Sequence, residues 1–208
     1  MSSLPNVSAL PLPRPSPGRI GPGAFDLLET SWRWLRSSGL GASHQRARLR
    51  RAASKHQPIV LGTAARPWSP DAESASALRS LAAFGGLEIH ITSRSPGLVQ
   101  SLPTLTALDR DHAVQVDVVV SGPDLRVRGV REGLGVVRRL AAEGIATRLL
   151  VGPREAEGAD PRRFFAAAFQ AGASDVQASK RTRGEREAVR FERLRLQHGF
   201  PRAHVGRG

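Results

Sequence analysis

The sequence of 208 residues contains no cysteine, no tyrosine and a single methionine. Without cysteine the chain forms no disulfide, offers no thiol nucleophile, and holds neither zinc nor an iron–sulfur cluster through thiolate ligands. It also has no apolar run long enough to cross a bilayer, and no basic segment followed by an apolar one at its N-terminus. We therefore expect a soluble, cytoplasmic protein without a membrane partner.

Acidic residues are scarce relative to basic ones, and the imbalance is confined to the two ends of the chain. The whole sequence carries 31 Lys and Arg against 18 Asp and Glu, a net charge of +13. Residues 1–56 account for +7 and residues 180–208 for +6, so residues 57–179 are neutral. Basic flanks attract phosphate backbones without reading their sequence. The charge pattern therefore favours a nucleic-acid partner at the flanks, or else a solvated, arginine-rich surface.

Composition divides the sequence into three parts. Residues 1–23 are rich in Pro, Ser and Gly and are predicted to be a disordered tail. Residues 24–56 are predicted to be a helical segment, with an amphipathic helix over Phe25–Arg36 and a basic helix over about His44–Ser54. Residues 57–208 form the third part, a folded domain that ends in a basic helix and tail.

Apolar runs alternate with helical patterns throughout this third part. Five runs rich in Val, Ile and Leu predict strands, namely Pro58–Thr63, Leu87–Thr92, Val114–Ser121, Ile145–Val151 and Ser174–Ala178. Helices are predicted after them, over about 72–84, 102–108, 127–142, 161–171 and 185–198. Such alternation is typical of β/α units on a parallel sheet. The predicted fold is α/β, a partial TIM-like (β/α) barrel of five or six parallel strands with an altered N-terminus; an open doubly wound sheet is the alternative.

Residues that directly follow the strands are the candidate site residues, because ligands bind at the carboxyl ends of parallel strands in both architectures. After the first strand, two prolines restrict a loop that carries a cation and an aromatic ring, an arrangement suited to a flat or anionic ligand. The candidate ligand-binding residues are Thr63, Arg66, Trp68, Arg94, Ser121 and Asp124. Asp117 stands inside an apolar strand, so it either points into the mouth near Arg148 or faces solvent.

Several of these segments also follow the motif order of a known family. Gly62-Thr63-Ala64-Ala65-Arg66-Pro67-Trp68-Ser69-Pro70 with Glu73 is similar to the G-T-x-T-D-P-Y-Q-P-x-E motif of radical S-adenosylmethionine proteins of the spore photoproduct lyase, or DNA repair photolyase-like, branch. Thr92-Ser93-Arg94 resembles the family's T-K-S, and Ser121 to Asp124 occupy the place of its fourth-strand Ser and Asp. The ending His198-Gly199-Phe200-Pro201-Arg202-Ala203 resembles its h-F-P-x-R-A. The resemblance covers about residues 45–208 and implies a partial barrel.

The chain departs from this family at the positions that carry its chemistry. Family members place C-x-x-x-C-x-x-C after the first strand, where three thiolates hold a [4Fe–4S] cluster, and this sequence has no cysteine. Ala65-Arg66 replaces Thr-Asp and Trp68 replaces Tyr, which weakens the expectation that S-adenosylmethionine binds. The resemblance therefore implies a cluster-less, non-catalytic relative without an assigned cofactor. It would act by binding, for example as an accessory partner of an active paralogue.

Two other functions also fit the sequence. In the first, the flanks bind a DNA or RNA backbone, and the contacts on the last predicted helix are Arg186, Arg190, Arg193 and Arg195. In the second, an enzyme of unknown, non-radical chemistry uses charged side chains that converge in the barrel mouth, namely Arg66, Arg94, Asp117 and Asp124. Because no phosphate-binding loop, nucleophile elbow or H-E-x-x-H motif is present, we assign no catalytic residue and no metal ligand.

Overall fold

The computed structural model describes residues 25–26, 46–47, 49–51, 54–55, 57–64, 66–70, 78–94, 96–152, 160–178 and 185–200, with the backbone alone for residues 25–26 and 185–190. The predicted tail over residues 1–23 and most of the predicted helical segment over residues 24–56 lie outside this part. The described part includes all five strands that the sequence predicts for residues 57–208.

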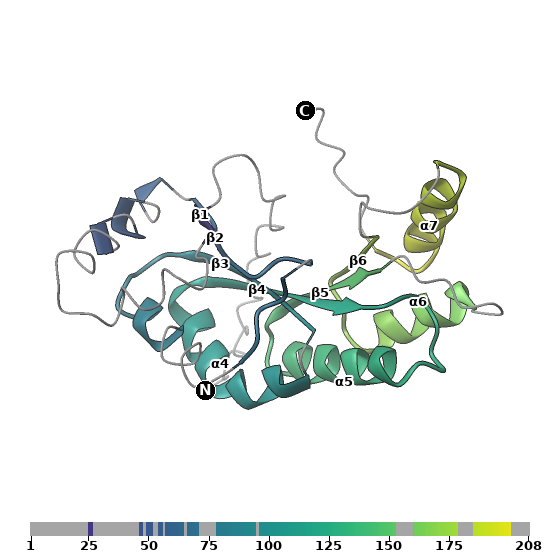
Figure 1. Ribbon diagram of the computed structural model, residues 1–208, viewed down its shortest axis with the longest axis horizontal. Coiled ribbons are helices and arrows are strands. Elements are labelled where there is room, and N and C mark those ends of the chain that lie inside the picture. The colour runs from purple at the N-terminus through teal and green to yellow at the C-terminus, as the bar shows by residue number, and fades with distance from the viewer. Residues whose placement is uncertain are drawn as a thin grey trace, which may run out of the picture.

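Six strands form one sheet, and their order in the sheet is their order in the chain (Figure 1). They are β1 (Phe25–Asp26), β2 (Ile59–Leu61), β3 (Glu88–Ser93), β4 (Ala113–Val120), β5 (Ala146–Val151) and β6 (Asp175–Ala178). Every neighbouring pair is parallel. Each connection therefore steps to the adjacent position in one direction, whereas a doubly wound sheet reverses its direction at a switch point. The predicted α/β class with parallel strands is confirmed.

Helices cover one face of this sheet (Figure 1). The helical elements are the 3-10 helix η1 (Pro96–Ser101), α4 (Leu102–Asp111), α5 (Arg128–Ala142), α6 (Pro161–Gln170) and α7 (Glu185–Gln197). Helix α7 lies at the end of the sheet, where it packs on β6 and α6. Residues 78–81, inside the helix predicted between the first two runs, are helical as well. Among the described residues after 57, the 3-10 helix η1 is the one helical element that the sequence did not predict.

Local chemistry sets the ends of these helices. Asp160 caps α6, because its carboxylate accepts hydrogen bonds from the backbone N–H groups of Arg162 and Arg163 at 3.0 and 3.3 Å. Pro161 follows in the first turn, where a missing N–H donor is harmless. Helix α5 ends where Gly144 adopts a φ of +78° and the N–H of Ile145 donates to the carbonyl of Leu140 at 3.1 Å.

The N-terminal prediction requires a correction. Phe25–Asp26, predicted as the beginning of an amphipathic helix, form strand β1 and pair with Ile59 and Val60 of β2. The edge of β2 offers unpaired backbone groups, and satisfying them in a ladder outweighs a weak helical periodicity. The basic helix predicted over about His44–Ser54 fits better, since the described residues 46–47, 49–51 and 54 are helical.

Alternate strand residues face the helices and build the hydrophobic core. This set consists of Ile59, Leu61, Ile89, Ile91, Val114, Val116, Val118, Val120, Leu149, Val151 and Val176, all buried. Helix α5 packs on β4 and β5, and its apolar stripe includes Val130, Val137 and Leu140. The helix-facing side of the sheet is thus mainly apolar, with Ser93 and Thr147 near strand ends as its buried polar residues, and most other polar strand residues lie on the other face.

Two glycines of α5 test this packing. A Cβ added at Gly133 would lie 2.6 Å from Cγ1 of Val120, whereas one added at Gly135 would meet nothing within 4 Å. We expect Gly135→Ala to stabilise the protein by about 0.5–1 kcal/mol, since alanine favours the helix. Gly133→Ala should destabilise it by about 1–3 kcal/mol, because branched Val120 cannot move aside freely. Urea unfolding of both variants measures the difference, and equal shifts would contradict the packing of α5 on β4.

Candidate functional site

The loop after β2 is built around Gly62. Its φ of +74° suits glycine, and an added Cβ would lie 2.4 Å from the backbone nitrogen of Trp68 and 2.7 Å from the carbonyl oxygen of Thr92. The loop then closes on itself, because Thr63 N–H donates to the Arg66 carbonyl at 2.9 Å and Arg66 N–H donates to Thr63 Oγ1 at 3.1 Å. The result is a short, well-bonded turn at the carboxyl end of β2.

Two arginine side chains lie at this turn, one from the turn itself and one from the residue after β3. Arg66 lies within it and is exposed, and its guanidinium makes no hydrogen bond or ion pair in the described part of the chain. Arg94, which follows β3, is also exposed and donates from one guanidinium nitrogen to the carbonyl of Ala64 at 3.3 Å. The structure therefore places Arg94 against the turn that carries Thr63 and Arg66.

Trp68 takes a different role from the predicted one. Its backbone extends the sheet, since its N–H donates to Thr92 O at 2.7 Å and its carbonyl accepts from Ser93 Oγ at 2.8 Å. Its side chain is buried among the core residues, with 6% exposed. Trp68 anchors the loop to the hydrophobic core and does not line an exposed binding surface.

The candidate residues Ser121 and Asp124 follow β4, and in the described part of the chain neither is hydrogen-bonded to Thr63, Arg66 or Arg94. Ser121 is exposed, and Gly152 approaches it so closely that an added Cβ would lie 2.8 Å from the Ser121 carbonyl oxygen. The Asp124 carboxylate accepts from the backbone N–H and the guanidinium of Arg126 at 2.9 and 3.0 Å. These hydrogen bonds and the charge of Arg126 lower the pKa of Asp124. Asp124 is thus a buried, ionised carboxylate in the loop before α5, and its partner Arg126 is itself 65% exposed.

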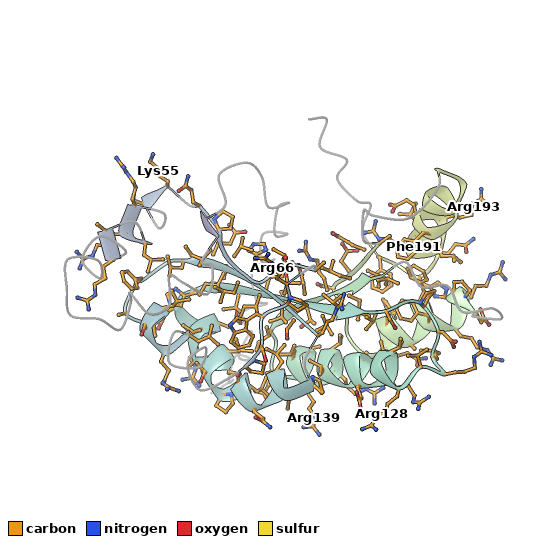
Figure 2. The ribbon with its side chains drawn as sticks, viewed as in Figure 1. Lys55, Arg66, Arg128, Arg139, Phe191 and Arg193 are labelled. Atoms are coloured by element: carbon orange, nitrogen blue, oxygen red, sulfur yellow. The ribbon has the colours of Figure 1, made fainter. Side chains whose placement is uncertain are left out.

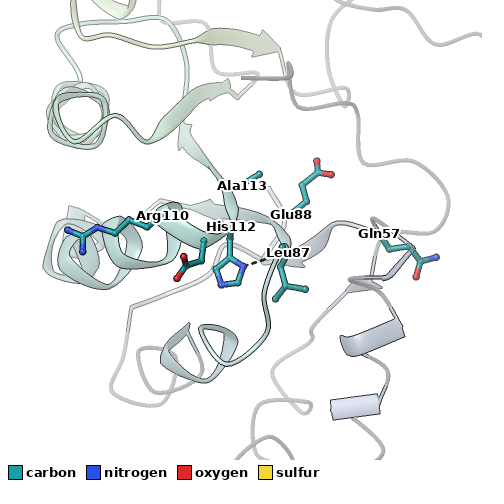
Figure 3. Close-up of a pocket in the computed structure, with 8 residues that line it drawn as sticks. Gln57, Leu87, Glu88, Arg110, His112 and Ala113 are labelled. Atoms are coloured by element: carbon teal, nitrogen blue, oxygen red, sulfur yellow. Dashed lines mark hydrogen bonds between the residues drawn. The ribbon is translucent and has the colours of Figure 1, made fainter. Parts of the chain in front are cut away.

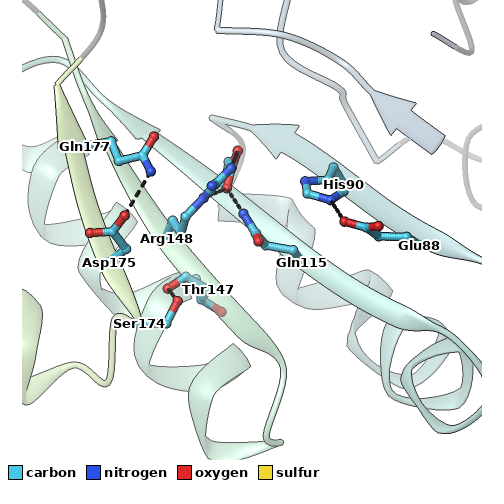
Figure 4. A network of polar contacts seen from close by, with 9 residues as sticks. Glu88, His90, Gln115, Thr147, Arg148, Ser174, Asp175 and Gln177 are labelled. Atoms are coloured by element: carbon cyan, nitrogen blue, oxygen red, sulfur yellow. Dashed lines mark hydrogen bonds and ion pairs between the residues drawn. The ribbon is translucent and has the colours of Figure 1, made fainter. Parts of the chain in front are cut away.

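The sheet face opposite the helices carries most of the polar strand residues, and its central feature is a buried ion pair (Figure 4). The guanidinium of Arg148 on β5 donates to both carboxylate oxygens of Asp117 on β4, each at 2.7 Å. Gln115 Nε2 donates to the same carboxylate at 2.9 Å. Asp117 and Arg148 are only 3% and 8% exposed. The expected position of Asp117 near Arg148 is confirmed, and the carboxylate accepts three hydrogen bonds from Arg148 and Gln115.

Sequence reasoning missed the rest of this polar face. On β3, His90 is fully buried and its Nε2 lies 2.7 Å from Glu88 Oε1. His90 and Gln115 are register neighbours, and within the described residues neither His90 Nδ1 nor Gln115 Oε1 has a hydrogen-bond partner. The signal in the sequence is a period of two, with polar residues at positions 88, 90, 115, 117, 175 and 177. These atoms could bond a small polar guest on this face.

The predicted nucleic-acid contacts on α7 are corrected by the structure at one position. Arg195 is 2% exposed and donates to Glu192 at 2.6 Å and to Asp175 of β6. Burial alone would lower the pKa of Arg195, but the bonds to Glu192 and Asp175 outweigh it and raise the value. Arg195 is an internal, neutralised cation because the helix packs on β6. Arg193 is exposed, while the side chains of Arg186 and Arg190 lie outside the described part.

A pocket of about 420 Å³ lies at the other end of the strands, where β3 and β4 begin (Figure 3). It is lined by Gln57, Gly86, Leu87, Glu88, Arg110, Asp111, His112 and Ala113. His112 Nδ1 accepts from the Leu87 N–H at 3.1 Å, a bond that needs a neutral imidazole. Burial lowers the pKa of His112, although the negative charge of Asp111 acts in the opposite direction. A lowered pKa favours the neutral imidazole that this hydrogen bond requires. The lining contains none of the residues that the sequence singled out.

Comparison of the chain with protein-family models, with curated proteins and with solved structures finds no match. Among the residues that the structure describes, no three His, Asp or Glu side chains gather in the manner of a metal site. Within the same residues, no helix has the length and apolar character that a bilayer-spanning segment needs.

Removing one partner of the central ion pair tests its burial. We expect Asp117→Asn to destabilise the protein by about 3–5 kcal/mol, because Arg148 is then buried without a counter-charge. Glu132→Gln is the matched control, since Glu132 pairs with Arg128 on the surface of α5 at 2.7 Å, and its loss should cost less than about 0.5 kcal/mol. Urea unfolding of both variants gives the comparison. Similar small losses would show that water reaches Asp117.

Proposed function

We propose that this protein is a non-catalytic, anion-binding relative of the radical S-adenosylmethionine proteins of the spore photoproduct lyase branch, built on a partial (β/α) barrel without a cluster. One observation carries the proposal. Asp117 is buried in its pair with Arg148 and Asp124 is hydrogen-bonded by Arg126, while the exposed Arg66 and Arg94 meet at the turn after β2. The groups open to a ligand at this turn are therefore cations, and both acidic candidates already have a basic partner.

The sheet order supports the barrel part of this proposal. Six parallel strands follow one another without a switch point, and helices α4, α5 and α6 lie on the same face. A singly wound sheet of this kind curves towards a barrel, with its inner face away from the helices. The polar face that carries Asp117 and Arg148 would then be the inner face. Strand β1 would take the place of the first strand, which the resemblance leaves without a counterpart.

The residues present do not fit the cluster that the resemblance would imply. A [4Fe–4S] cluster of this family needs three thiolates, and the 208 residues contain no cysteine. At the corresponding mouth the structure offers guanidinium groups and hydroxyls, which do not replace soft anionic ligands. No step of the proposed function therefore passes through a cluster.

Anaerobic reconstitution of the full chain with iron and sulfide tests this conclusion. We expect iron well below one equivalent of a four-iron cluster per chain and no absorbance band near 400 nm, because thiolate ligands are lacking. Iron analysis and the visible spectrum after desalting give the result. Four irons per chain with that band would contradict the cluster-less assignment.

The ligand class follows from the two arginines. A guanidinium fork matches the oxygen atoms of phosphate or carboxylate, and charge-assisted bonds of this kind are stronger than neutral ones. Arg94 is already oriented by its bond to Ala64 O, and the turn that holds Arg66 is fixed by its bonds to Thr63. The arrangement is thus partly preorganised for a small anion, and a phosphate-bearing ligand fits best.

Titration calorimetry with pyrophosphate at low salt tests the site. We expect the double variant Arg66→Gln/Arg94→Gln to bind at least about tenfold more weakly, because two charge-assisted hydrogen-bond donors are removed. The control Arg79→Gln/Arg162→Gln removes the same charge from exposed positions elsewhere and should change affinity by less than about twofold. Equal losses in both variants would show general attraction to a basic chain and would overturn the proposed site.

Nucleic-acid binding through the flanks is the second candidate, favoured by exposed Arg193 and by the charge of residues 180–208. Deleting the C-terminal segment would not test it cleanly, because Phe191, Leu194 and Phe200 are buried in the core. Charge-neutralising variants on α7 are the suitable probe. An enzyme of other chemistry in the mouth has less support, since its two candidate carboxylates are ion-paired.

A further inference from the structure

The outward face of α5 carries a row of arginines that the charge balance of residues 57–179 conceals. At about 100° per residue, Arg128, Arg131, Arg138 and Arg139 fall within roughly a third of the helix circumference. This set, the α5 basic stripe, lies opposite the buried residues Val130, Val137 and Leu140. All four arginines are exposed, and Arg128 and Arg139 point away from the sheet (Figure 2).

The charges of the stripe are available to a partner. Arg138 and Arg139 make no hydrogen bond or ion pair in the described part of the chain. Arg131 donates to the carbonyls of Leu125 and Arg126 at 3.2 and 2.7 Å, which orients its guanidinium and leaves its charge uncompensated. Arg128 pairs with Glu132, but its side chain is 86% exposed, so this pair is easily exchanged.

Gly135 lies in the middle of the stripe and exposes the helix backbone. An added Cβ there would meet nothing within 4 Å, so the packing of the fold does not require glycine at this position. Glycine inside a helix costs stability relative to alanine. A small residue between two pairs of arginines lets the backbone of a second helix approach closely. The stripe thus has arginines on either side of Gly135 and no side chain at its middle.

We propose that the α5 basic stripe docks an acidic helix of a partner protein. From Arg128 to Arg139 the stripe extends about 16 Å, or three helical turns, so the matching helix carries carboxylates at every third or fourth position over three turns. The carboxylates pair with the arginines, and the apolar or small residues between them lie over Gly135. This surface is separate from the turn that holds Arg66 and goes beyond the proposed anion site.

Other occupants fit the stripe less well. A second copy of this chain would bring a net charge of +13 against the same basic surface. A bilayer surface needs large apolar side chains between the cations. Among the described residues the exposed large apolar side chains are Val127, Phe169 and Leu196, and only Val127, which caps α5 before Arg128, is near the stripe. A phosphate backbone would face the carboxylate of Glu132 beside the arginines, whereas a protein helix can offer that carboxylate a basic residue.

Fluorescence anisotropy with a model helix tests the proposal on the full chain. The probe is a labelled peptide of about 20 residues with glutamates on one face at every third or fourth position and alanines elsewhere. We expect Arg131→Gln/Arg138→Gln/Arg139→Gln to weaken its binding at least about tenfold at 0.1 M salt. The control Arg50→Gln/Arg79→Gln/Arg110→Gln removes equal charge from other exposed positions and should weaken binding less than about twofold.

A second variant separates docking from simple attraction. Gly135→Leu keeps every charge and fills open space, so it should stay folded by circular dichroism while weakening peptide binding at least about fivefold. Equal binding of a peptide with the same composition in scrambled order would overturn the proposal. So would equal losses in the two triple variants, an unchanged affinity of Gly135→Leu, or complete displacement of the peptide by an equimolar duplex oligonucleotide.

Discussion

The ion pair between Asp117 and Arg148 is the constraint on which the rest of the structure depends. It joins β4 to β5 on the one face of the sheet where a charge can be tolerated. A shift of either strand by one residue would turn that side chain towards the apolar helices and leave a charge buried without a partner. Such a pair contributes little net stability compared with apolar residues, but it fixes the register of the central strands and the identity of the two faces.

The division into two faces explains how the molecule separates folding from binding. Val, Ile and Leu on the helix side supply the burial that holds α4, α5 and α6 in place. On the polar side, Asp117 accepts hydrogen bonds from both Gln115 and Arg148, and Asp175 accepts one from Arg195. The acids are thereby neutralised inside the fold. The arginines that remain exposed, at the turn after β2 and along α5, are the charged groups available to bind other molecules.

The strands and helices after residue 57 were predictable because their apolar patterns are unambiguous. Within the predicted run Val114–Ser121, residues 114–120 are buried on both faces of a parallel sheet, and Gly or Pro marks most of the connections. The candidate turn was also predictable in part, since the carboxyl ends of β2 and β3 are adjacent, and Arg94 after β3 therefore reaches the turn that carries Arg66.

The remaining features depend on contacts that periodicity does not encode. Phe25–Asp26 pair with β2 because a strand edge is available there, not because of their own pattern. Arg195 looks like a surface residue in the sequence, yet the packing of Phe191 and Leu194 turns it towards Asp175. The α5 basic stripe was hidden because acidic residues elsewhere in the same segment cancel its charge in any sum along the chain.

A crystal structure of the full chain grown with pyrophosphate is the most direct measurement of this account. The account predicts the anion on Arg66 and Arg94 at the carboxyl end of the sheet, with the Asp117–Arg148 pair unchanged. An anion on the polar face, with Arg148 turned away from Asp117 to bind it, would contradict the central claim that the charges of that face are reserved for the fold.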